Sequence, residues 1–92
     1  MNELKNYESV CIFKEKTEIE VYEKFSARIH EILDNITKLD YIGIKNLAYE
    51  IKGNKKGYYV LLEFTATEKQ VTELEKYYRL NDNIIKFITI RL

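Results

Sequence analysis

The sequence lacks proline and tryptophan, and it contains only three glycines, one cysteine and one histidine. With so few turn-forming residues, little of the chain is typical of a linker. The 92 residues are therefore expected to form one domain, residues 1–92, ordered from about residue 7 to the end. The single Cys11 cannot form an internal disulfide, and its alternating apolar segment predicts a buried thiol.

The same scarcity argues against catalysis. His30 has no second histidine or reactive thiol to complete a metal site or a nucleophile–base pair, so we expect it to be structural. The three glycines form neither a phosphate-binding loop nor a dinucleotide fingerprint. We therefore expect no enzymatic activity, no cofactor and no metal. The first residues contain no apolar run typical of a signal peptide or a membrane span, which favours a cytoplasmic protein.

The net charge is zero, which excludes a strongly basic nucleic-acid-binding protein, but the charges are segregated. Residues 17–36 carry five acidic and two basic side chains. Residues 45–56 and residues 76–92 each carry four basic side chains and one acidic side chain. Cations are thus concentrated in the middle of the chain and in its last segment, where solvated surface charge is the simpler interpretation.

Hydrophobic periodicity predicts six elements. Residues 7–13, 39–51, 58–65 and 84–92 alternate or are rich in β-branched and aromatic residues, as strands are. Two segments with apolar residues three and four apart predict helices, and each follows a capping-box pattern. The first box is Thr17–Glu20, ahead of a stripe that runs from Tyr22 to Ile36; the second is Thr67–Gln70, ahead of Val71, Leu74 and Tyr78. Residues 52–57 are expected to form a hairpin turn.

The order βαββαβ predicts an α+β, ferredoxin-like sandwich, in which two helices cover one face of a four-stranded antiparallel sheet. The other face is then uncovered. Five strand aromatics, of which several are expected to point away from the helices, could stack on bases there while neighbouring cations contact phosphates. These aromatics are Tyr7, Tyr49, Tyr58, Tyr59 and Phe87. An unpaired outer strand could equally accept a partner's backbone, and aromatics also simply suit strands.

The segment Gly43–Ile51 (GIKNLAYEI) resembles the signature of the bacterial small ribosomal subunit protein six family. Tyr7-Glu8, residues 57–60, and residues 73–75 with residues 79–83 agree with that family in order and spacing, so the resemblance covers about residues 6–92. Many members have a second basic residue where Asn46 stands, and many have tryptophan where this chain has Ile42. This chain also lacks the proline that is common after the first strand.

The resemblance implies a ferredoxin-like structural protein of the small subunit that binds ribosomal RNA next to small-subunit protein eighteen, with which members form a heterodimer. A basic partner would supply much of the phosphate-facing charge that this neutral chain lacks. Matching positions near the RNA or the partner are Tyr7, Lys45, Tyr49, Arg79, Lys86 and Arg91.

Two other interpretations stay open, one from the residues and one from the resemblance. One is a ferredoxin-like regulatory or small-molecule-binding domain that dimerises through a strand edge. The other is a repressor role, in which the protein and its partner bind a messenger that mimics the ribosomal site. Weak association between copies of the isolated protein also stays open.

Overall fold

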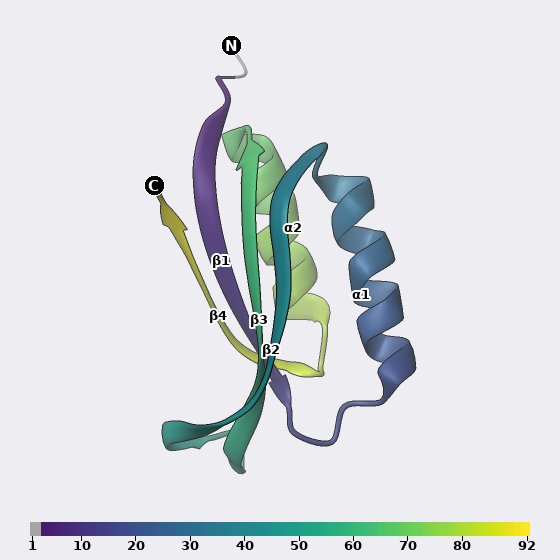
Figure 1. Ribbon diagram of the computed structural model, residues 1–92, viewed down its shortest axis with the longest axis vertical. Helices are drawn as coiled ribbons and strands as arrows, with labels where there is room; N and C mark the ends of the chain where they lie inside the picture. Colours follow the sequence, from purple (N-terminus) through teal and green to yellow (C-terminus); the bar gives the residue numbers. More distant parts are fainter. Residues whose placement is uncertain (1–2) are drawn as a thin grey trace.

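The computed structural model describes residues 3–92 as a four-stranded antiparallel sheet with two helices packed against one face (Figure 1). The elements follow the predicted order: β1 (Lys5–Lys14), α1 (Ile19–Ile32), β2 (Asn35–Ile51), β3 (Asn54–Ala66), α2 (Glu68–Leu80) and β4 (Ile84–Arg91). The strands are arranged β2-β3-β1-β4, so β1 and β3 are central and the other two strands form the edges. This is the ferredoxin-like sandwich that the sequence predicts. Neither helix in the described residues is long and apolar enough to cross a membrane.

Alternation along the strands sends one set of side chains toward the helices. Tyr7, Cys11 and Phe13 of β1 lie on this side and are buried, as are Val60 and Phe64, two of the residues opposite them on β3. Directly opposed residues in an antiparallel pair share a face, so the register places the buried rows of both central strands in one layer. The remaining positions of these strands project to the other side of the sheet, which no helix covers and which we call the open face.

The helices contribute stripes that meet this layer. Phe25, Ile29 and Ile32 of α1 and Leu74 and Tyr78 of α2 are buried. Fully burying an apolar side chain of this size contributes about 1.5–3 kcal/mol, so these stripes fix the helices on the sheet. Leu74 and Tyr78 are two of the three stripe residues expected for the second helix, and the third is partly buried.

One of the two predicted capping boxes is present. In α2 the Gln70 backbone N–H donates to Thr67 Oγ1 at 3.2 Å, and the Thr67 N–H donates to Gln70 Oε1 at 3.0 Å. The prediction for α1 was wrong, because its N-cap is Glu18 and the cap makes no side-chain hydrogen bond. Thr17 instead donates its hydroxyl to the Lys14 carbonyl at 2.7 Å. That bond belongs to the turn that leaves β1, and Thr17 lies one residue before the N-cap position, which Glu18 occupies.

Two boundaries also differ from the prediction. The first helix ends at Ile32, and Ile36 lies in β2 opposite Phe64, because an inward apolar residue satisfies the helical and the strand pattern alike. The hairpin turn is shorter than residues 52–57. Lys52 and Gly53 have φ angles of 47° and 80°, which is the left-handed pair that a two-residue hairpin uses. Gly57 therefore lies within β3 instead of in the turn.

Candidate nucleic-acid interface

The open face has an apolar centre and charged margins. Register places Val10 and Ile12 of β1 beside Leu61 and Tyr59 of β3 on this face. On the edge strand β4, Ile88 and Ile90 are opposite Val10 and Glu8 and are 53% and 48% exposed. Neighbouring exposed apolar side chains of this kind are typical of surfaces that meet another molecule.

Lys86 and Tyr49 form a direct contact, although 37 residues separate them. Lys86 Nζ donates to the Tyr49 hydroxyl at 3.0 Å and lies 5.3 Å from the centroid of its ring. The contact exists because β2 has 17 residues, so the β2–β3 hairpin extends beyond the body of the sheet and its tip curves (Figure 1). Tyr49 is 63% exposed, so much of its ring remains open to a base.

Two further cations lie beside this pair. Lys52, Arg79, Lys86 and Phe87 line the same surface pocket, which has a volume of about 210 Å³. The Arg79 guanidinium carbon lies 5.6 Å from the centroid of the Phe87 ring. We call Tyr49, Lys52, Arg79, Lys86 and Phe87 the hairpin-tip cluster. Its pocket has three cations in its lining and, within residues 3–92, no carboxylate.

The cluster unites three of the six residues singled out in the sequence, namely Tyr49, Arg79 and Lys86. Lys52 was missed, because the sequence marks it only as a turn residue. Lys52 follows Tyr49 by three residues in the sequence. The short turn places it at the tip of the hairpin, which reaches the beginning of β4.

The other three candidates lie elsewhere. Lys45 is opposite Gly57, and its Nζ lies 5.8 Å from the centroid of the Tyr59 ring on the open face. Tyr7 is only 8% exposed and stacks on Phe64 in the core, with ring centroids 5.6 Å apart. Arg91 is exposed opposite Tyr7, five residues past Lys86 and hence about 17 Å along the strand.

The strand aromatics divide between the two faces. Tyr59 lies on the open face and Tyr49 reaches Lys86, so two of the five aromatics are available outside the helical layer. Tyr7, Tyr58 and Phe87 pack with the helix-side core. Exposed rings beside cations are therefore fewer than the sequence suggests, and they are concentrated at the hairpin and at β3.

Groups that could act in catalysis are occupied structurally. Burial raises the pKa of the Cys11 thiol from 9.0 to about 12, and hydrogen bonds with Tyr78 and Ser9 lower it only partly. His30 donates from Nδ1 to the Ser26 carbonyl at 2.7 Å on an exposed turn of α1. Within residues 3–92, no three His, Cys, Asp or Glu side chains are grouped so that they could hold a metal ion. Cations beside exposed rings are the groups that contact phosphates and stack on bases in nucleic-acid interfaces.

Residues 6–91 match the model of the family described as ribosomal protein S6. The chain belongs to the ribosomal protein S6 family. It is 37% identical to small ribosomal subunit protein bS6 of Helicobacter pylori over 95 residues, which cover 96% of this chain and 65% of the relative. It is 36% identical to the protein of the same name from Moorella thermoacetica, where the match covers 97% of this chain and 95% of the relative. The chain thus spans just under two thirds of the Helicobacter relative and nearly all of the Moorella relative.

Solved structures agree with this assignment to the S6 family. The crystal structure of 30S ribosomal protein S6 from Thermotoga maritima superposes with a TM-score of 0.86 at 29% identity, covering 98% of this chain and 89% of that one. An uncharacterized protein from the same organism gives a TM-score of 0.68 at 11% identity, with 98% of this chain and 99% of that chain covered, and shares the fold alone. The resemblance carried by Gly43–Ile51 is confirmed at the level of the family.

Proposed function

We propose that this chain is a non-catalytic constituent of the cytoplasmic small ribosomal subunit, which binds ribosomal RNA as a heterodimer with small-subunit protein eighteen. Membership of the S6 family supports the ribosomal part of the proposal. The observation that carries the RNA part is the hairpin-tip cluster, where Lys52, Arg79 and Lys86 line one pocket beside the exposed Tyr49 ring.

The cluster is suited to a folded RNA in two ways. Its three cations are close enough to act on neighbouring phosphates, and each neutralised phosphate releases counterions and adds affinity at low salt. The hydrogen bond from Lys86 holds the Tyr49 ring in place, so the ring offers a preorganised surface for an unstacked base. A small set of cations suffices because a basic partner would contribute the rest of the charge.

Lys45, Arg91 and the open face extend this surface in the proposal. Lys45 lies over the Tyr59 ring, so a cation and an aromatic face are presented together a second time. Arg91 is exposed near the end of β4 and, as the residue opposite Tyr7, lies on the helix side of the sheet, whereas the exposed Ile88 and Ile90 lie on the open face. Within residues 3–92 this edge strand has no neighbour on its outer side, so protein eighteen could cover it. Tyr7 would then act indirectly, by packing β1 against Phe64 of β3 while its backbone position pairs with Arg91 of β4.

The direct test mixes the recombinant protein with protein eighteen and a platform fragment of the small-subunit RNA. A ternary complex is expected at modest salt in a gel-shift assay. The absence of any complex, with both proteins folded, would remove the proposal. Substituting His30→Ala should leave assembly unchanged, since its side chain only contacts its own helix.

A charge variant tests whether the cluster carries the RNA contact. Lys86→Ala should weaken RNA binding in the ternary complex and reduce the slope of log affinity against log salt by about 0.7–0.9, as for one lost phosphate contact. The matched control is Lys69→Ala, an exposed cation on α2. If both variants changed the slope equally, the effect would come from net charge and the cluster would not be the interface.

A further inference from the structure

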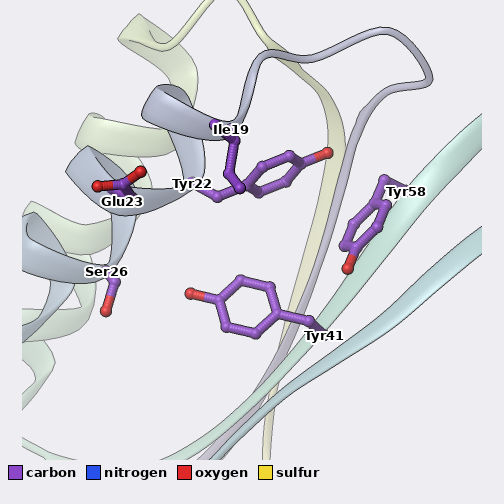
Figure 2. Close-up of a pocket in the computed structure, with 6 residues that line it drawn as sticks. All are labelled: Ile19, Tyr22, Glu23, Ser26, Tyr41 and Tyr58. Carbon is purple, nitrogen blue, oxygen red and sulfur yellow. The ribbon is translucent and has the colours of Figure 1, made fainter.

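Three tyrosine rings from three elements surround a pocket of about 490 Å³ on the helix side of the sheet (Figure 2). Tyr22 of α1 lies between Tyr41 of β2 and Tyr58 of β3. The Tyr22 and Tyr41 rings are nearly perpendicular, with centroids 6.3 Å apart. The Tyr22 and Tyr58 rings are tilted by 49° at 4.9 Å. The rings therefore present faces and edges in several directions around one hollow, which is open to solvent.

The pocket is held by the core behind it. Phe13, which is fully buried, packs on the inner side of Tyr22 with centroids 4.9 Å apart. Burial also raises the pKa of the Tyr22 hydroxyl above its ordinary value, so this ring is neutral at physiological pH. A neutral tyrosine ring carries negative charge density on its face, which attracts cations. A ligand at this pocket would thus meet rings that are already in position.

The charge at the rim is negative. Glu23 and Ser26 complete one side of the pocket in Figure 2, and its lining within the described residues contains no lysine or arginine. Lys24, the nearest cation along the chain, lines a different pocket between α1 and α2. Glu18 and Glu20 lie in the same acidic stretch and offset the positive end of the helix dipole. This surface repels phosphate and attracts cations.

We propose that this aromatic pocket binds the side chain of an arginine presented by a partner protein. A guanidinium is planar and stacks on aromatic faces while its N–H groups pair with a carboxylate, here Glu23. Lysine offers a point charge that is more strongly hydrated and cannot stack. Ile19 and Ile44 are 68% and 45% exposed beside the rings and would cover the aliphatic stem. The site goes beyond the RNA contacts proposed above, and its acidic rim favours a protein as the source.

The test uses the free protein, so its outcome does not depend on whether the chain binds RNA. Nα-acetyl-arginine N-methylamide is titrated at constant ionic strength while the tyrosine ring resonances are followed by NMR. Saturable shifts are expected at the rings of Tyr22, Tyr41 and Tyr58, with a Kd on the order of 10 mM for one stacked ion pair. The citrulline analogue has the same shape without the charge and should cause no saturable shift. Equal binding of citrulline, tighter binding of the lysine analogue, or no saturation with arginine would each overturn the proposal.

Two variants separate the charge from the rings. Glu23→Gln keeps the shape of the side chain, and Tyr41→Leu keeps apolar area at an exposed strand position while removing the ring. Each is expected to weaken arginine binding roughly fivefold. The control Glu20→Gln removes a carboxylate from the same helix outside the pocket lining and should change binding less than twofold, by about the general loss of one remote charge. If Glu20→Gln weakened binding as much as Glu23→Gln, the ligand would be attracted by net charge and not by this pocket.

Discussion

Gly57 lies at a contact that leaves no space for a side chain. It is buried in β3, and a Cβ at this position would overlap Cγ2 of Ile12 and come within 3.3 Å of the Phe13 carbonyl oxygen. Leu47 closes the third side, with Cδ2 at 3.5 Å. Gly57→Ala therefore forces the central strands apart at the place where the β2–β3 hairpin leaves the body of the sheet.

The loss of stability in Gly57→Ala depends on how easily the atoms around the new methyl group can move. Ile12 is 7% exposed on a central strand, and its Cγ2 is attached directly to the branched Cβ, so the overlap is relieved only by a change of χ1, which is restricted in a β-branched residue, or by a backbone shift. Overpacking a fixed site costs about 1–3 kcal/mol. Alanine regains roughly 0.5–1 kcal/mol over glycine within a strand, because it restricts the unfolded chain. The net destabilisation expected for Gly57→Ala is about 1 kcal/mol, or roughly 6 °C in Tm for a domain of this size.

A double-mutant cycle with Ile12→Ala isolates the overlap. Removing the Ile12 branches frees the space that the new methyl group needs, so Gly57→Ala should cost less than about 0.5 kcal/mol in that background. Urea unfolding followed by circular dichroism measures all four proteins. Equal costs in both backgrounds, or a melting temperature for the single variant close to that of the wild type, would refute the steric explanation.

Four further outcomes are expected. Thr67→Ala should lower stability by about 1 kcal/mol in urea unfolding because it removes a complete capping box, whereas Thr17→Ala, which caps nothing, should cost less than half as much. The thiol of Cys11 should react with a disulfide reagent only as fast as the protein unfolds, and faster labelling would show that the core opens locally. The pKa of that thiol is raised in the folded protein, so its contribution to stability is complete below pH 9 and is lost as the pH rises toward about 12. The urea midpoint should therefore fall over this pH range more steeply in the wild type than in Cys11→Ala. Ternary-complex affinity should fall in Lys86→Ala and not in Lys69→Ala, as measured by gel shift over a salt series.

The elements of the fold follow from local patterns that tertiary structure does not override. Alternation in residues 7–13 and 58–65 predicts β1 and β3, which are extended in the structure by a few residues at their ends. In the Thr67 box, Thr67 is the N-cap residue and its hydroxyl oxygen accepts from the Gln70 N–H. The Thr17 box fails because the helix begins one residue later, with Glu18 as its N-cap, so Thr17 lies in the turn and donates its hydroxyl to the Lys14 carbonyl. A capping pattern thus predicts a helix nearby more reliably than it identifies the cap residue.

The candidate site is less accessible to sequence reasoning, because it depends on where the hairpin tip ends. Tyr49, Arg79 and Lys86 were marked by family resemblance, while Lys52 joins them only because the turn is two residues long and the hairpin curves. Tyr7 is an aromatic residue that could stack on a base. Its position in the alternation of β1, however, points its side chain into the core. The pocket around Tyr22 combines residues 19 to 58, and no local pattern indicates that their rings meet.

The net charge is zero, but the fold places the acidic and the basic side chains on separate surfaces. The acidic stretch lies on α1, beside the free edge of β2, whereas Lys52, Arg79 and Lys86 gather where Lys86 meets Tyr49. Salt screens charges that lie more than about one Debye length apart, roughly 8 Å at physiological salt. A bound group therefore responds to the charges of the surface near it and not to the net charge of the protein. One chain can therefore attract phosphates at the hairpin tip and a cationic protein segment at α1 at the same time. If this is so, Glu23→Gln should leave the salt dependence of RNA binding unchanged, and Lys86→Ala should leave arginine binding unchanged. A variant that altered both would show that the two surfaces are not independent.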